Sequence, residues 1–159
     1  MAVDKKAYIE ALKREGWTVR EVKLNHKDFP DIVTLNDVSA GTEGNVIEIS
    51  PPSGSEVRIL EDARFWMYLA GSPGTGEIGD KDDISIRKAV VFGEEIRIDS
   101  GIYSNFKQTD QEKIYRFVQP IKITASDKLL IKVTPSEAVD ADYCKFGLDA
   151  ILLSGKTVL

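Results

Sequence analysis

The chain has 159 residues, 42% of them hydrophobic and 30% charged, with a formal net charge of −5 at pH 7. This composition is typical of one globular domain that buries a sizeable core without a disulfide or a metal, and Cys144 is the only cysteine. The longest apolar stretches are much shorter than the roughly 20 residues that cross a bilayer, so we expect no membrane span. The first residues lack the apolar core of a secretory signal, which predicts synthesis in the cytoplasm.

The charge is distributed unevenly along the chain. Residues 1–27 contain seven Lys or Arg and four Asp or Glu, a net charge of +3, so the remaining residues carry −8. A basic N-terminal segment on an acidic body could dock on an anionic neighbour, although a solvated helix face explains so small an excess as well. The overall negative charge argues against direct binding of nucleic acid.

The N-terminal segment begins with a short amphipathic helix. Asp4 is a suitable N-cap, the apolar residues of 5–15 recur at helical spacing, and Gly16 predicts the end of the helix. Residues 17–24 alternate as a strand does, whereas residues 25–44 contain a proline that a central strand would not accommodate. We therefore expect a helix, a strand and then an extended arm with one edge strand at most.

From residue 45 onward the chain repeats a pattern of short alternating strands separated by turns. The expected strands cover 46–49, 57–60, 64–70, 84–92, 95–98, 113–123 with a break at Pro120, 128–134 and 143–153. Two loops rich in glycine and polar residues, 71–83 and 99–112, separate some of them. About eight short strands with no helix between them predict an all-β fold, an antiparallel jelly-roll-like or Greek-key β-sandwich. The expected domains are an N-terminal helix and extended arm, 1–44, and the sandwich, 45–159.

The sequence offers little material for catalysis. One histidine, His26, and one cysteine, Cys144, cannot build a zinc site or a recognisable Ser–His–Asp triad. We expect His26 at the surface or in an interface, and Cys144 as a small buried hydrophobic residue. Glu48 and Asp149 could face a concave sheet as a carboxylate pair, but carboxylates on strands are usually solvated charges. We therefore predict no enzymatic activity, no metal site and no cofactor.

The strand at 64–70 carries the best candidates for ligand contact. If Phe65 and Met67 face the core, Trp66 and Tyr68 form an aromatic platform on the outer face. Such a platform could stack on a sugar, or could be covered by the N-terminal helix or by a neighbouring subunit. We favour a cover by the helix, because a helix of about three turns is marginal unless it packs against something.

Two stretches of the chain resemble a known class of protein. Residues 47–60, IEISPPSGSEVRIL, are similar to the opening strands of small β-sandwich structural proteins of phage and other virus particles. Residues 120–130, PIKITASDKLL, followed by IKVTPS and FGLDAILLSG, are similar to their closing half. The resemblance implies a capsid, minor capsid or head decoration protein that is located in the virion. It also implies a symmetric homo-oligomer with other capsid proteins as partners, and no catalytic residues or cofactor.

In such proteins an N-terminal arm commonly reaches onto a neighbouring subunit. The apolar residues expected to anchor the arm are Tyr8, Ile9, Leu12, Trp17, Phe29, Ile32 and Val33. The alternative is that these residues pack on their own sandwich. The alternative function is a carbohydrate- or ligand-binding module that uses the platform of Trp66 and Tyr68.

Overall fold

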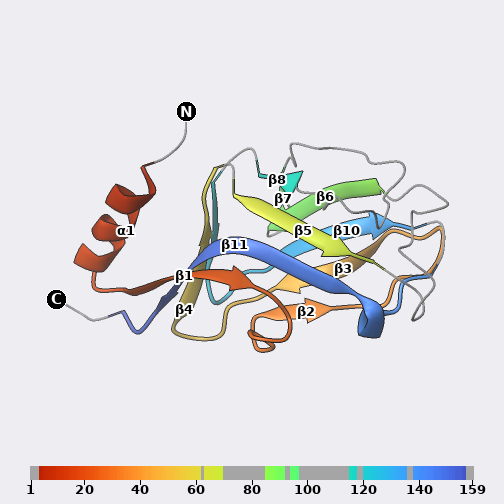
Figure 1. The fold of residues 1–159 in the computed structure, drawn as a ribbon, viewed down its shortest axis with the longest axis horizontal. Helices are drawn as coiled ribbons and strands as arrows, with labels where there is room; N and C mark the ends of the chain where they lie inside the picture. The colour runs from red at the N-terminus through yellow and green to blue at the C-terminus, as the bar shows by residue number, and fades with distance from the viewer. Residues whose placement is uncertain are drawn as a thin grey trace.

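The computed structural model describes residues 4–61, 63–69, 85–91, 94–96, 115–117, 120–135 and 138–156. Within them the chain forms two antiparallel sheets, and an N-terminal helix lies at one end of the molecule (Figure 1). The elements in chain order are α1 (Lys5–Arg14), β1 (Thr18–Leu24), β2 (Val33–Leu35), β3 (Gly44–Ile49), β4 (Ser55–Ile59), β5 (Arg64–Tyr68), β6 (Ser85–Val91), β7 (Glu94–Ile96), β8 (Tyr115–Arg116), β9 (Ile121–Ile123), β10 (Leu129–Thr134), the 3₁₀ helix η1 (Ala141–Tyr143) and β11 (Lys145–Ser154).

The six-stranded sheet, called sheet A here, is built around β11. Strand β1 pairs with one edge of β11 over residues 148–154, and β4 and β5 pair in succession with the other edge. Strand β4 pairs with residues 151–154 and β5 pairs with residues 145–148. The two strands therefore lie end to end along the same edge of β11, separated by a turn at Leu60. Strand β9 pairs with the other edge of β4, and strand β8 pairs with the other edge of β5. Within the described residues, β1 therefore forms one edge of sheet A, and β8 and β9 together form the other edge.

The second sheet, sheet B, has the order β2-β3-β10-β6-β7. The chain crosses from one sheet to the other after β1, β3, β5, β7, β9 and β10, so neighbours in sequence repeatedly lie in opposite layers. This alternation is typical of jelly-roll-like and Greek-key sandwiches. The predicted fold class, an antiparallel β-sandwich with a short N-terminal helix, is confirmed.

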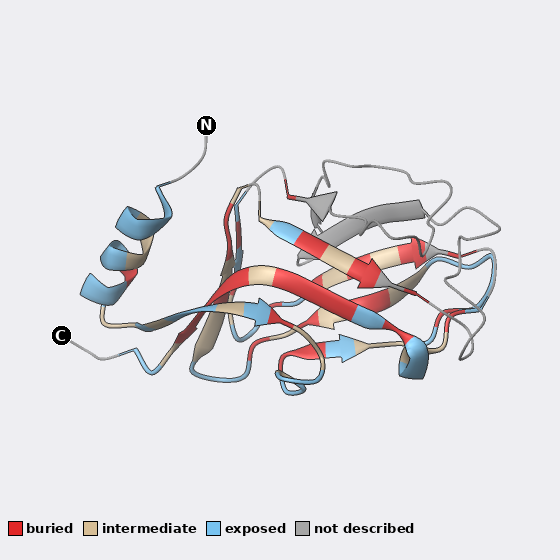
Figure 2. Ribbon diagram, in the orientation of Figure 1, coloured by how far each residue is buried: buried red, intermediate tan, exposed pale blue. Residues whose placement is uncertain are grey.

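Apolar side chains fill the space between the two sheets. Along β11 every second residue from 146 to 152 points into this core, whereas Ile151 and Leu153 lie on the outer face. The ring centroid of the fully buried Phe65 lies 5.2 Å from that of Phe117 and 6.2 Å from that of Phe146. Buried residues are concentrated on the strands, and α1 is mostly exposed (Figure 2).

Helix α1 is capped at both ends. Asp4 accepts a hydrogen bond of 3.2 Å from a backbone N–H of the first turn, as an N-cap does. At the other end the backbone N–H groups of Gly16 and Trp17 donate to the carbonyls of Lys13 and Leu12, and Gly16 has a φ of 101°. This is a Schellman arrangement, which favours glycine and places Trp17 in the same apolar cluster as Leu12. The helix therefore leads into β1 through a well-defined turn.

The N-terminal predictions agree with the structure in outline. The helix ends at Arg14, one residue before the expected end, and the edge strand expected between residues 25 and 44 is β2. Strands β1 and β2 add one edge strand to each sheet, so residues 18–35 are integrated in the sandwich. The division into an N-terminal helix and extended arm, 1–44, and a sandwich domain, 45–159, stays a prediction.

Two later predictions concern the second half of the chain. The break expected at Pro120 separates β8 from β9. The two predicted loops, 71–83 and 99–112, lie outside the described residues. Within the described part of the chain, no helix is long and apolar enough to cross a membrane.

Candidate functional site

The candidate functional site lies on the surface, on the outer face of sheet A. No group of three His, Cys, Asp or Glu able to hold a metal ion occurs among the described residues. Glu48 and Asp149, weighed above as a carboxylate pair, do not form one, because they project from opposite layers of the sandwich. Glu48 projects from β3 of sheet B and lies 3.6 Å from Lys128, while Asp149 lies on the outer face of sheet A. Strand periodicity alone does not tell which sheet a strand joins.

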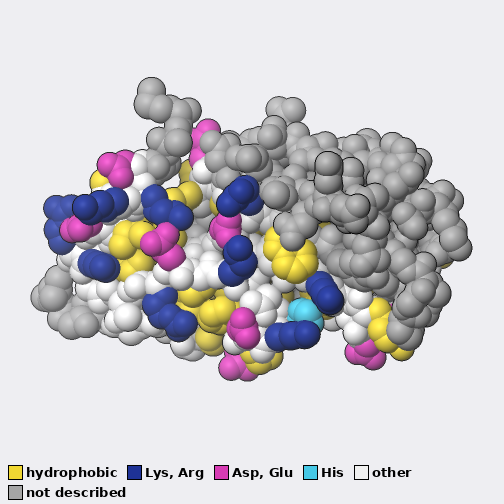
Figure 3. All heavy atoms as spheres, viewed as in Figure 1, with side chains coloured by type: hydrophobic (Ala, Val, Ile, Leu, Met, Phe, Trp, Pro, Cys, Tyr) yellow, Lys and Arg dark blue, Asp and Glu magenta, His cyan; other side chains and the backbone are white. Residues whose placement is uncertain are grey.

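A groove of about 470 Å³ lies on the outer face of sheet A, beside the first turn of α1. Its floor is largely apolar, and its rim carries basic side chains from α1, β1, β4 and β5. The lining residues are Lys5, Glu21, Val22, Lys23, Arg58, Leu60, Glu61, Ala63, Arg64, Asp149, Ala150 and Ile151. Figure 3 shows this face of the molecule, where Lys and Arg side chains surround small apolar areas.

Ion pairs cross the groove. Lys5 Nζ of α1 lies 2.9 Å from a carboxylate oxygen of Glu21 on β1, and this pair links the first turn of the helix to the sheet edge. Asp149 is shared by two cations, because its oxygens lie 3.9 Å from Lys23 Nζ and 3.7 Å from Arg64 Nε. All five side chains are more than a third exposed, so each pair stabilises the fold by about 1 kcal/mol at most.

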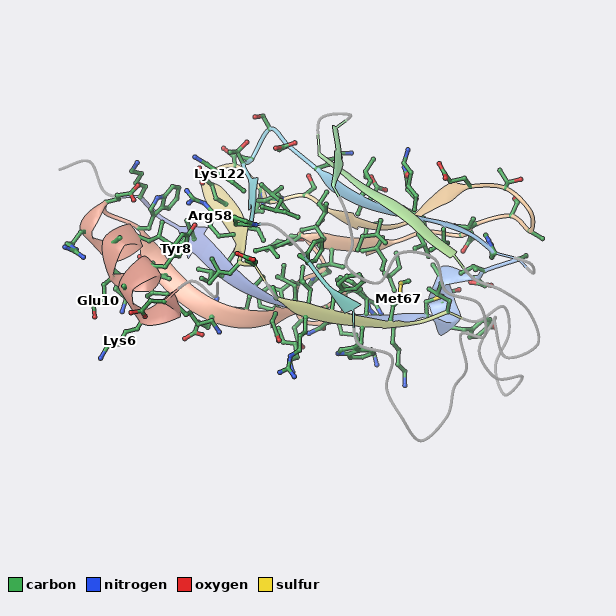
Figure 4. All side chains as sticks on the ribbon, turned by 90° about the horizontal axis from the view of Figure 1, so that it is seen from above. Lys6, Tyr8, Glu10, Arg58, Met67 and Lys122 are labelled. Atoms are coloured by element: carbon green, nitrogen blue, oxygen red, sulfur yellow. The ribbon has the colours of Figure 1, made fainter. Side chains whose placement is uncertain are left out.

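Arg58 links the wall of the groove to the helix. Its Nη1 donates to the hydroxyl oxygen of Tyr8 on α1 (3.0 Å), and its Nη2 donates to Glu56 (2.9 Å). Burial lowers the pKa of Arg58, but these hydrogen bonds outweigh that effect and raise the pKa above its ordinary value. Figure 4 shows Tyr8 turned from the helix toward Arg58, while Lys6 and Glu10 point away from the sheet. The guanidinium therefore stays charged and holds α1 on sheet A.

The predicted aromatic platform is described for one of its two members. Phe65 and Met67 are buried, which is the condition stated for the platform, and Trp66 lies half-buried on the outer face of sheet A. The indole packs so closely on β11 that a Cβ added to Gly147 would come within 2.5 Å of Trp66 Nε1. The side chain of Tyr68 is not among those described.

The expected cover of Trp66 by the helix is wrong. Helix α1 packs farther along the same face, where Leu12 joins Leu60, Ile151 and Leu153 in an apolar cluster. The tight turn into β1 keeps the helix beside the C-terminal half of β11, whereas Trp66 lies opposite the N-terminal half. The turn geometry thus decides which part of the sheet the helix reaches.

The seven apolar residues predicted as interface anchors all pack on their own sandwich in this structure. The buried ones are Leu12, Ile32 and Val33; Phe29 packs against the main core; and Tyr8, Ile9 and Trp17 pack around the cluster under α1. Within one chain, these residues therefore follow the alternative given above, in which they pack on their own sandwich. Their role in a contact between subunits stays a prediction.

His26 and Cys144 lie away from the groove. Cys144 is buried and its thiol donates to the carbonyl of Asp140 (3.2 Å), which confirms the expected small core residue. His26 is half-buried in the turn after β1. Its burial, with a smaller contribution from the charge of Lys27, lowers the pKa of the imidazole, so His26 is neutral at pH 7.

The comparisons with known proteins give a structural likeness and no sequence relative. No family model matches the chain, and no curated protein matches it. The chain is similar in structure to VP17, a capsid protein of bacteriophage P23-77, at 9% identity and a TM-score of 0.45, over 88% of this chain and 98% of that chain. It is also similar to the VP16–VP17 complex of the two major capsid proteins of that phage, at 9% identity and a TM-score of 0.44, over 85% and 98%.

Both of these structures are of phage capsid proteins. The roles of residues are taken from this chain alone.

Sequence reasoning missed the groove as a unit. Its local signal was the alternation of β1, which places Glu21 and Lys23 on one face of the strand. Arg64 and Asp149 come from strands far along the chain. Nothing local in the sequence indicates that β1 pairs with β11, and this pairing brings the charged side chains together.

Proposed function

We propose that the chain is a structural subunit of a virus particle, located in the virion, that assembles through contacts with copies of itself and with other capsid proteins. The virion setting follows the sequence resemblance to phage and virus structural proteins. The observation that carries the assembly role is the division of surface charge between two parts of the molecule.

The outer face of sheet A and helix α1 form the basic part, called the basic face below. Its Lys and Arg residues are Lys5, Lys6, Lys13, Arg14, Lys23, Arg58, Arg64, Lys122, Lys145 and Lys156, and its acidic residues are Asp4, Glu10, Glu15, Glu21, Glu56, Glu61 and Asp149. Elsewhere among the described side chains the balance is reversed. Arg20, Lys27, Lys128 and Lys132 stand against Asp28, Asp31, Asp37, Glu43, Glu48, Asp140 and Asp142.

A molecule with a basic face and an acidic remainder is complementary to copies of itself. Complementary potentials steer association and fix the relative orientation of the partners. A repeated contact of this kind builds a ring, a shell or a lattice, depending on the angle between copies. The charge division therefore favours assembly over the function of an isolated binding module.

The groove itself favours a contact surface over a catalytic centre. Two of its carboxylates, Glu21 and Asp149, are paired with lysine or arginine. The described residues that line it include no Ser, Cys or His that could act as a nucleophile or base. We accordingly propose a non-enzymatic role.

Contacts made by the N-terminal segment belong to the same proposal. The exposed face of α1 carries Lys6, Lys13 and Arg14, which can meet an acidic surface without any change in the helix. Exchange of the apolar anchors between copies would require the turn at Gly16 to open.

The proposal is tested by the absolute mass of the full chain in solution, measured by light scattering across a series of protein and salt concentrations. We expect a mass above the 17.6 kDa of one chain that rises with protein concentration at low salt. Added salt limits the attraction between exposed charges to about 10 Å at 0.1 M, so the mass should fall toward one chain. A mass of 17.6 kDa under every condition would contradict the proposal.

The exposed part of Trp66 keeps a carbohydrate-binding role as the second candidate. An indole fixed flat on a sheet, with Arg64 and Asp149 on the neighbouring positions of the same face, is an arrangement that can stack on a sugar ring. Titration of the Trp17→Phe variant with cello- and chito-oligosaccharides isolates the fluorescence of Trp66. A saturable change would support this role, and an unchanged spectrum would remove it.

A further inference from the structure

A rigid acidic tip lies at the end of the molecule away from α1 (Figure 1). It is formed by η1, Ala141–Tyr143. The backbone N–H of Ala141 donates to Asp37 (2.8 Å), and that of Asp142 donates to Asp140 (3.0 Å), so two carboxylates hold the backbone of the tip in place. The carboxylates of Asp37 and Asp140 are thus engaged with the backbone, and the tip has a fixed shape.

Two side chains of the tip are left to face the solvent. Asp142 is exposed, and its carboxylate makes no hydrogen bond or ion pair with another described residue. Tyr143 is 38% exposed, and it is the one large hydrophobic side chain among the described residues that is exposed. An aromatic residue beside a carboxylate that has no partner among the described residues has the character of an interface anchor, since tyrosine is enriched where proteins meet.

The groove on sheet A has the complementary chemistry. Among the described residues, Lys23 and Arg64 share the carboxylate of Asp149 at 3.9 and 3.7 Å, distances longer than a hydrogen bond. A second carboxylate can therefore bind between these two cations without breaking a strong pair. Leu60 and Ala63 lie beside them in the lining and provide an apolar surface of the kind on which a tyrosine ring packs.

The tip and the groove of one copy cannot meet. The tip directly precedes β11, and the groove lies beside residues 149–151, several residues farther along the same strand and on its outer face. At about 3.3 Å per residue the separation along the strand is roughly 20 Å. A contact between them must therefore join two copies head to tail.

We propose that the η1 tip of one copy docks in the groove of the next copy, with Asp142 between Lys23 and Arg64 and Tyr143 on Leu60 and Ala63. This inference rests on the proposed assembly function and names the two surfaces that carry it. Arg64 can donate two N–H hydrogen bonds to the carboxylate in a bidentate geometry, which fixes the orientation of the neighbour. Because the two surfaces differ, the contact is heterologous and propagates from copy to copy until a ring closes or a lattice forms.

Charge reversal on each side gives a decisive test. In the Asp142→Lys variant a basic tip meets a basic groove, and in the Arg64→Glu variant an acidic tip meets a groove that carries a second carboxylate beside Asp149. We expect each variant alone to remain at 17.6 kDa under conditions where the natural chain associates. An equimolar mixture restores both kinds of contact, because each tip then finds a groove of opposite charge, so the mass should rise again.

The controls reverse charges that lie outside the two surfaces. Lys27→Glu and Asp31→Lys change the net charge by the same amounts at exposed positions, and both should associate as the natural chain does. Tyr143→Ser keeps all charges and should raise the concentration needed for half association about tenfold, the usual cost of losing an interface anchor. Circular dichroism of each variant verifies the fold, since every substituted side chain is exposed.

The outcomes separate this inference from the function on which it rests. If the natural chain associates and the charge-reversed variants associate equally, or if their mixture stays monomeric, the tip-in-groove contact is overturned and the assembly function stands. If the natural chain stays at 17.6 kDa at every concentration and salt, both are overturned.

Discussion

The two apolar clusters of the molecule differ in how they are built. The main core joins strands of both sheets and includes residues fully removed from solvent, such as Phe65, Ile47 and Val133. The cluster under α1 has four buried members, Leu12, Leu60, Ile151 and Leu153, surrounded by side chains that are only partly covered. The helix therefore depends on a small apolar contact, its two caps and the polar links to Arg58 and Glu21.

This difference indicates that local unfolding begins at α1. Local unfolding is governed by the few contacts that a segment makes with the rest, so α1 should detach at a lower free energy than the sandwich unfolds. The basic face includes α1, and one rim residue of the groove, Lys5, belongs to the helix. The helix, which we expect to detach before the sandwich unfolds, thus lies at the surface to which we assign the contact between copies.

The largest effect is expected in the main core. Phe65→Ala removes a fully buried ring that packs between Phe117 and Phe146, and should lower the free energy of unfolding by about 3–5 kcal/mol. Urea unfolding followed by circular dichroism measures the change. Phe29→Ala, at the half-buried margin of the same core, should cost clearly less. Equal losses would contradict the description of Phe65 as more deeply buried in this core than Phe29.

Leu12→Ala should act on the helix alone. The loss is about 2 kcal/mol, the lower end of the range for buried leucine, because few neighbours surround the site. Hydrogen exchange should accelerate in α1 and stay unchanged at Phe146 and Leu148 of β11. The exposed Lys13→Ala variant of the same helix provides the matched control. Equal acceleration in α1 and β11 would show that the two clusters unfold together.

Gly16→Ala tests the turn that fixes the helix. A φ of 101° is strained for any residue with a Cβ, and the expected cost is about 1–2 kcal/mol. The faster exchange should again be confined to α1. Gly41→Ala places the same kind of strain, at a φ of 73° with open space around the Cβ, far from the helix. That variant should leave the exchange of α1 as it is in the natural chain.

Tyr8→Phe isolates the polar link between the helix and the sheet. The variant leaves Arg58 Nη1 without its 3.0 Å acceptor and should cost about 1 kcal/mol. A double-mutant cycle with Arg58→Met measures the coupling between the two side chains. A coupling energy of zero would mean that the hydrogen bond does not hold the helix on the sheet.

The smallest effect concerns Asp127, the buried carboxylate in the turn between β9 and β10. Its burial raises the pKa, and this outweighs the opposing hydrogen bond from the backbone N–H of Lys128. A raised pKa means that ionisation disfavours the folded state above that pKa and has no such cost in acid, below the pKa of the unfolded chain. Asp127→Asn should therefore be slightly more stable than the natural chain at pH 7, with the difference disappearing on acidification. A difference in stability that grows in acid would contradict the raised pKa of Asp127.

The sequence predicted those features that depend on neighbouring residues. Alternation placed Phe65 and Met67 in the core and Trp66 outside, the caps at Asp4 and Gly16 bounded the helix, and Pro120 marked a break. Each of these follows from local geometry, which a short window of sequence contains.

The rest depends on which strands pair. Glu48 and Asp149 have the same alternating surroundings in sequence, yet β3 and β11 belong to different sheets. The position of α1 depends on the pairing of β1 with β11, more than 100 residues away. The groove combines residues from several such elements, so no motif could indicate it. Pairing between distant strands is decided by the packing of the whole sandwich rather than by local pattern.

The tip-in-groove contact is tested most directly by carbodiimide cross-linking of an equal mixture of ¹⁴N- and ¹⁵N-labelled full-length chain, followed by mass spectrometry. The reagent joins a carboxylate to a lysine only where the two touch, and the Lys5–Glu21 pair at 2.9 Å provides an internal control within one copy. We predict mixed-isotope peptides that join Asp142 to Lys23 or Lys5 of another copy. Cross-links confined to single copies, with the Lys5–Glu21 product present, would contradict the account.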